Sequence, residues 1–335
     1  QLVAMLQSYA PFGESNQLGI DSISQLYIKV DDLVAPGVDV WMGRRYYGRR
    51  EIHLNDYFWL NSGQGAHAGA GIEGIDTGLG KFHAAVFMIE DKLDAEGPHI
   101  NTTTLDLRHD GMAIGETGEL GLWLYAAFRH EEVELNLQGR DGYGFGLWHQ
   151  DSFLPKSTNT LSFVYRKGAA IPQGKISPQP VREAQGYDLE EASRWEVNND
   201  FLYEPDSLFA LHWTLIYRHD ESGVMGDEGD ELVWFSTGVR PIYYVSDNLN
   251  LAFEYGFDSV ENQRTSLDGS LHKGTVALQL TINRGYFTRP VLRLFATYAT
   301  WSDDFRGLVG SRAGDIAYAD DTSGWSLGMQ MEAWW

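Results

Sequence analysis

The stretch from Trp41 to Gly63, WMGRRYYGRREIHLNDYFWLNSG, interleaves charged side chains of both signs with aromatic rings. A charge removed from water is costly unless it is paired, so neither a hydrophobic core nor a lipid-facing surface tolerates this mixture. Aromatic faces beside charged hydrogen-bonding groups suit a pyranose ring, which has an apolar face and a rim of hydroxyls. The alternative is an exposed loop whose charges only solvate it, and this stretch alone leaves both interpretations open.

The composition of the 335-residue chain excludes several classes of protein. It has no cysteine, which excludes a disulfide framework and a thiolate zinc site. Its net charge of -22 would repel nucleic-acid phosphates. No apolar run reaches the roughly 18 residues of a transmembrane helix. An aromatic content of 13% with 37 dispersed glycines is typical of many strands joined by turns.

Alternating segments predict those strands. In Leu249 to Phe257 the odd positions are large and apolar, and the even positions are Asn, Ala, Glu and Gly. Thr275 to Ile282, Phe209 to Tyr217 and Gly324 to Trp335 alternate in the same way. Each such strand therefore has one apolar face and one polar or small face.

A soluble sandwich also alternates, but two details favour a membrane barrel. The strands are about ten residues long, and their outward faces often end in an aromatic residue, as the girdles of a membrane barrel require. About sixteen candidate strands can be counted once Arg49 to Leu60 is excluded as too charged to face lipid. We therefore predict an all-β protein, a single transmembrane antiparallel β-barrel domain over residues 1–335, with the excluded segment as a loop folded into the lumen.

Enzyme motifs in the chain lack the context they need. Gly324 to Gly328 matches G-x-S-x-G, but too little chain follows to supply the acid and histidine in that fold's order. Gly69 to Gly74 matches G-x-G-x-x-G with no helix pattern behind it, and the ten histidines show no metal-binding spacing. Glu51 and Asp56 as a glycosidase pair would need a defined separation across a bond. The sequence therefore predicts no enzyme, cofactor or metal.

Motifs along nearly the whole chain resemble the maltoporin family of outer-membrane sugar porins. The first is WMGRRYY with Arg49, His53 and Asp56, followed by the glycine-rich GIEGIDTGLGK. The others come in family order: GVRP at 238–241, VENQRT at 260–265, Arg289-Pro290, FATYA at 295–299 with Trp301, and the terminal MEAWW.

The resemblance implies a homotrimer of 18-stranded barrels in the bacterial outer membrane, in contact with its lipid. It implies an inward-folded third loop, here residues 49–63, that narrows each pore for passive, selective diffusion of maltose and maltodextrins. Carried over by motif, the substrate-binding residues along a polar track and an aromatic slide are Arg49, Glu51, His53, Asp56, Phe58, Phe287 and Trp334. For Trp334 an interior packing role is the alternative, and for Arg44 and Arg45 an ion pair of the barrel wall is the favoured interpretation.

The sequence also departs from the family pattern. Phe58 falls where the family has a tyrosine and Phe287 where it has a tryptophan, while two other family aromatics would fall near Thr158 and Glu14. Gln1 aligns inside the family's third strand, so about two N-terminal strands are expected to be missing from this chain, which lacks the basic start of a signal peptide. A non-selective porin, a porin for another sugar, and a carbohydrate-active enzyme or soluble lectin remain as alternatives.

Overall fold

The computed structural model describes residues 1–7, 22–62, 67–92, 99–132, 138–171, 190–205, 208–223, 231–263, 265–312 and 315–333. Sixteen strands form one sheet: β1 (Leu2–Gln7), β2 (Ser22–Ala35), β3 (Val38–Arg45), β6 (His67–Asp76), β7 (Lys81–Lys92), β8 (His99–Ile114), β9 (Gly118–Arg129), β10 (Arg140–Leu154), β11 (Ser157–Gly168), β12 (Ser193–Tyr203), β13 (Phe209–Glu221), β14 (Glu231–Tyr244), β15 (Leu249–Asn262), β16 (Leu267–Thr281), β17 (Val291–Trp301) and β20 (Ser323–Glu332).

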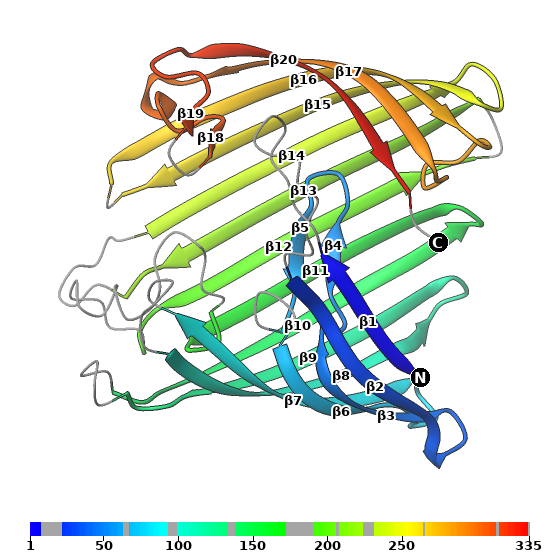
Figure 1. The fold of residues 1–335 in the computed structure, drawn as a ribbon, viewed down its shortest axis with the longest axis vertical. Helices are drawn as coiled ribbons and strands as arrows, with labels where there is room; N and C mark the ends of the chain where they lie inside the picture. The colour runs from blue at the N-terminus through cyan, green and yellow to red at the C-terminus, as the bar shows by residue number, and fades with distance from the viewer. Residues whose placement is uncertain are drawn as a thin grey trace.

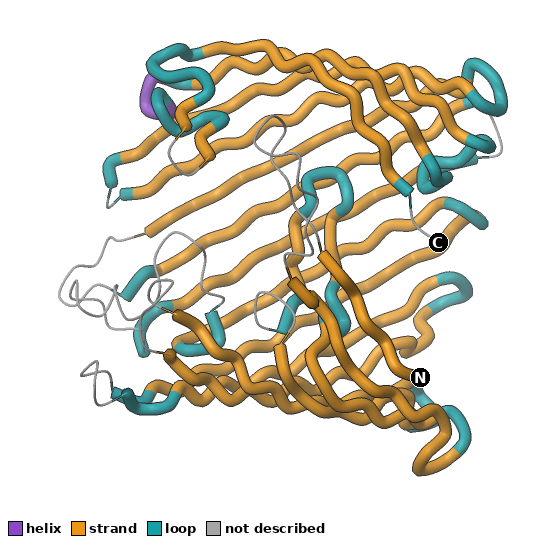
Figure 2. Tube along the Cα trace, in the orientation of Figure 1, coloured by secondary structure: helices purple, strands orange, loops and turns teal. Residues whose placement is uncertain are grey.

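Every neighbouring pair in this sheet is antiparallel, and the strands follow one another in chain order apart from the inserted short elements. The sheet curls around a lumen, with β1 and β20 as its two ends (Figure 1). Among the described connections, the short turns at 36–37, 77–80 and 245–248 lie at one end of the barrel, and the longer connection at 302–322 lies at the other (Figure 2). The predicted sixteen-stranded antiparallel barrel wall is thus confirmed, with several strands longer than the predicted ten residues, since β8 has 16.

The two faces of the wall are inverted relative to a soluble protein. On β16, Val276, Leu278 and Leu280 point outward and are roughly half exposed, whereas Ala277 and Gln279 point inward and are buried. On β20, Leu327 is 78% exposed. Large apolar side chains on the outside and small or polar ones inside are the pattern of a wall that faces lipid.

Aromatic rings form a row at each end of this outer face. At the end of the barrel that carries the 302–322 connection, Trp195 lies 5.2 Å from Tyr217 between ring centroids, and Phe235 lies 6.1 Å from Phe257. Near the short turns, Phe153 stacks on Phe201 at 5.8 Å. Two rows separated by an aliphatic band match the aromatic girdles at the two interfaces of a membrane.

Four further short strands lie outside the wall sheet. β4 (Arg50–Ile52) pairs with β5 (Tyr57–Leu60). After the 3-10 helix η2 (Asp303–Phe305), β18 (Ser311–Arg312) pairs with β19 (Asp315–Ile316). The segment Arg49–Leu60, which the sequence excluded from the wall, contains the β4–β5 pair and so satisfies part of its own backbone groups. Within the described ranges, no helix is long and apolar enough to cross a membrane.

Candidate functional site

The β4–β5 hairpin lies inside the lumen (Figure 1), where the chain leaves the wall after β3 and returns to it at β6. Alternation gives the hairpin two faces. Ile52 and Trp59 are buried on one face, whereas Glu51 is exposed and Phe58 half-buried on the other. The charged stretch that the sequence excluded from the wall therefore has an apolar side against the barrel and a polar side open to the lumen.

The base of the hairpin is fixed by a buried guanidinium. Arg108 on β8 pairs with Asp106 through Nε at 2.7 Å and donates from its other nitrogens to the Ser62 hydroxyl at 2.9 Å and to the Gly48 carbonyl. Asp106 also accepts from the Trp123 indole at 2.9 Å and from Ser62. A side chain at Gly48 would collide with Arg108, and Gly48 has a positive φ of 48°, so glycine is required there.

A second buried guanidinium fixes β5. Arg166 on β11 donates to the Trp59 carbonyl and to the Glu196 carboxylate, both at 2.7 Å, and the Tyr57 hydroxyl donates to the same carboxylate. Arg166 and Glu196 are almost completely buried. Because the base of the hairpin and its strand β5 are held by buried paired charges that bond to its backbone, the hairpin is a rigid part of the barrel.

Apolar packing also holds the buried face of the hairpin against the wall. Ile52, Trp59 and Leu60 form one cluster with Trp123 and Trp148 of the wall.

At the tip of the hairpin, Leu54 lies against β14 at Gly238. A Cβ at position 238 would lie 2.5 Å from Leu54 Cδ2, so the absence of a side chain at Gly238 makes room for the hairpin tip. The hairpin consequently spans from the β8–β12 side of the lumen to β14.

The open face carries an aromatic and charged array. The Arg49 guanidinium lies over the rings of Tyr46 and Phe58, at 3.8 and 4.5 Å from their centroids. Glu51 and Asp56 are exposed beside them. Stacking on two rings restricts Arg49 while leaving its charge toward the lumen.

The hairpin tip meets the turn between β16 and β17. His53 contacts the Phe287 ring edge-on at 5.2 Å between centroids, and Phe287 is 46% exposed. Arg289 Nη2 lies 3.4 Å from His53 Nε2, and Arg289 also pairs with Glu332 of β20 at 2.8 Å. This contact brings Phe287 next to the polar residues of the hairpin although more than 200 residues separate them.

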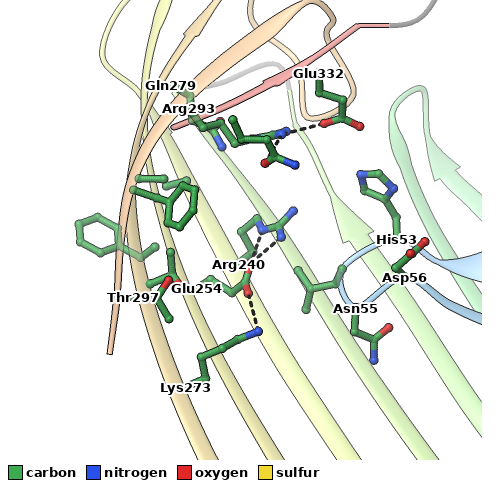
Figure 3. Close-up of a pocket in the computed structure, with 17 residues that line it drawn as sticks. His53, Asn55, Asp56, Arg240, Glu254, Lys273, Gln279, Arg293, Thr297 and Glu332 are labelled. Atoms are coloured by element: carbon green, nitrogen blue, oxygen red, sulfur yellow. Dashed lines mark hydrogen bonds and ion pairs between the residues drawn. The ribbon is translucent and has the colours of Figure 1, made fainter. Parts of the chain in front are cut away.

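Beyond the tip, inward-facing side chains of β14 to β17 and β20 line a cavity of about 600 Å³ (Figure 3). Arg240 donates to Glu254 from Nε at 2.7 Å, and Lys273 Nζ lies 4.0 Å from the same carboxylate. Arg293 pairs with Glu332 at 2.7 Å. His53 and Asp56 close the cavity on the hairpin side.

Five of the seven residues predicted as substrate-binding lie together on the hairpin: Arg49, Glu51, His53, Asp56 and Phe58. Phe287 joins them at the tip, and Trp334 lies outside the described residues, as does Glu14. Arg45 forms the predicted wall ion pair with Glu73 at 3.0 Å.

Sequence reasoning assigned no role to the anchors Arg108 and Arg166 or to the cavity residues Lys273 and Gln279. The alternation of the strands could have identified these residues, since all four lie at the polar, inward-facing positions of their strands.

The LamB porin family matches residues 2–335 of the chain. The chain belongs to this family. It is therefore an outer-membrane β-barrel porin of a sugar-channel family and not an enzyme, which agrees with the lipid-facing wall and with the polar hairpin inside it.

Burial changes the titration of two hairpin groups in this porin. Partial desolvation inside the barrel raises the pKa of the Glu51 carboxyl although its side chain remains accessible to the lumen, and the neighbouring Asp56 carboxylate acts in the same direction. Burial lowers the pKa of the His53 imidazole, and Arg289 adds to this effect.

Acidification should remove the negative charge of Glu51 at a higher pH than for an ordinary glutamate, and should protonate His53 at a lower pH than for an ordinary histidine. Both changes add positive charge, so cation preference should fall as pH drops from about 7 to about 4. Reversal potentials in a salt gradient measure this. Glu51→Gln should remove the part of the fall that comes from the Glu51 carboxyl; an identical pH profile in the variant and the parent would contradict the assignment.

Proposed function

We propose that this porin mediates passive, selective diffusion of maltose and maltodextrins across the outer membrane. One observation carries the proposal: the hairpin presents a stacked arginine and two carboxylates on its open face, and its tip residue His53 contacts the exposed ring of Phe287. A pyranose has the same combination of an apolar face and a hydroxyl rim. The sugar-binding residues we propose are Arg49, Glu51, His53, Asp56, Phe58, Phe287 and Trp334.

The domain assignment is part of this proposal. Residues 1–335 are one transmembrane barrel domain, and residues 49–63 are its constriction loop. The family resemblance supports a homotrimer, with each barrel as a separate pore.

The chemistry of permeation follows from the hairpin. A sugar that enters a narrow pore loses water, and each hydroxyl left unpaired would cost about 1–3 kcal/mol. The carboxylates of Glu51 and Asp56 accept hydrogen bonds from the sugar hydroxyls, and Arg49 donates hydrogen bonds to the hydroxyl oxygens. Phe58 and Phe287 offer ring contacts that are similar for successive glucose units. Several weak and nearly equal sites allow a sugar to bind without being trapped, which conduction requires.

Planar-bilayer recordings test the proposal. Maltodextrins added to open channels should block the ion current reversibly. The block should occur at roughly micromolar to millimolar concentrations, which is the range expected for weak sites. A non-selective porin would conduct ions with no response to maltodextrin. Block by a different sugar alone would retain the mechanism and change the substrate.

Phe287→Ala should weaken maltodextrin block about threefold to tenfold while leaving open-channel conductance nearly unchanged, because it removes a ring contact and no charge. Phe145→Ala removes a ring from the lipid-facing side and serves as the matched control. Equal block of all three proteins would rule out Phe287 as a sugar contact.

A further inference from the structure

The cavity beyond the hairpin tip has the composition of a sugar site in its own right. Its charged lining is balanced, with Arg240, Lys273 and Arg293 against Asp56, Glu254 and Glu332. Glu254 and Glu332 are each already engaged by two cationic side chains. An anionic ligand would have to compete with these carboxylates for the cations, whereas a neutral ligand would leave the pairs intact.

The lining also supplies an apolar surface between polar groups. Phe295 on β17 packs against the cluster that contains Ala252 and Ala277, and all three line the cavity. Thr275 and Thr297 lie beside it and bond to each other at 2.8 Å. An aromatic ring set among hydroxyls, an amide and an ammonium group suits a neutral polyhydroxylated ring better than a hydrocarbon or an ion.

Gln279 is the polar group that points to a ligand. It pairs in register with Asn250 on β15 and with Arg293 on β17, lines the cavity, and is only 6% exposed (Figure 3). Within the described part of the chain its amide has no hydrogen-bond partner, unlike neighbouring Gln330, which accepts from Arg293 at 3.2 Å. The amide faces the cavity and can both donate and accept, so a hydroxyl ligand in the cavity could bond to it in both ways.

We propose that this cavity is a subsite for one pyranose ring of a neutral oligosaccharide, with Gln279, Lys273 and Asp56 as the hydroxyl-binding groups and Phe295 as the ring contact. The inference rests on the proposed sugar-selective function and adds a binding position on the wall of β15 to β17, opposite the hairpin. Lys273 is half exposed and 4.0 Å from Glu254, so its ammonium group retains donors for a hydroxyl.

The test is current-noise analysis of maltodextrin block in planar bilayers, which separates association from residence time. Gln279→Leu keeps the size of the side chain and removes both hydrogen-bonding atoms. It should shorten the residence time about threefold to tenfold, with the association rate and the open-channel conductance unchanged. Gln279→Asn retains an amide on a shorter side chain and should give an intermediate residence time.

Asn250→Leu is the matched control, because Asn250 is the inward-facing register partner of Gln279 on β15 and does not line the cavity. It should keep the parental residence time. Equal residence times in Gln279→Leu and the parent, or equal losses in both leucine variants, would overturn the subsite and leave the proposed function standing. Failure of maltodextrin to block the parent channel would overturn both.

Discussion

Replacing Arg108 with leucine should lower the free energy of unfolding by about 3–5 kcal/mol, because it leaves the Asp106 carboxylate buried without its partner. The same change frees Gly48 and Ser62 at the base of the hairpin. Open-channel conductance should therefore rise and maltodextrin block should weaken in any protein that still folds. Denaturant titration in detergent micelles and bilayer recording measure the two effects.

Arg306→Leu is the control for the loss of an arginine. Arg306 pairs with Asp303 at the surface of a connection, and a pair this exposed contributes about 0–1 kcal/mol. The double replacement of Arg108 and Asp106 by leucine should recover part of the lost stability, since no uncompensated charge remains. Equal stability of Arg108→Leu and Arg306→Leu would contradict the role of Arg108 as an anchor.

Val276→Arg should destabilise the barrel by about 2–4 kcal/mol, because Val276 lies near the middle of β16 on the lipid-facing side. Thr275→Arg, one residue earlier on the lumen-facing side, should have a much smaller effect. Unfolding in lipid vesicles by denaturant measures both. Similar losses at the two positions would indicate a sheet buried on both sides rather than a membrane wall.

The alternation of apolar and polar residues predicted the wall strands well, because side chains of a strand point to opposite faces in turn and this wall has lipid on one face and the lumen on the other. The segment Leu249–Phe257 shows this directly, since Asn250 and Ala252 are buried inward while Phe253 and Tyr255 are exposed outward. The charge of Arg49–Leu60 similarly predicted its absence from the wall, because charge in lipid is costly at any register.

The tertiary contacts of the hairpin could not be predicted in this way. Arg166 bonds to the backbone of Trp59 across 107 residues, and no local pattern specifies such a pair. Ile52 and Trp59 were part of a stretch that appeared uniformly polar and aromatic, and only the pairing of β4 with β5 separates its two faces.

The side-chain contacts of the cavity could not be predicted from the sequence either. Gln279 belonged to the polar face of an alternating strand, but whether its amide has a partner within the described residues depends on the side chains of the two neighbouring strands, β15 and β17. A sequence pattern predicts the face that a residue occupies and leaves its partners undetermined.

The most direct test of the account is liposome swelling with the purified porin, which reports sugar flux rather than ion current. A sugar-selective pore should admit maltotriose faster than the smaller sucrose, because the hairpin and Phe287 replace the hydration of a linear glucan as it passes. Flux that falls with molecular size alone, so that sucrose enters faster than maltotriose, would contradict the account and identify a general diffusion porin.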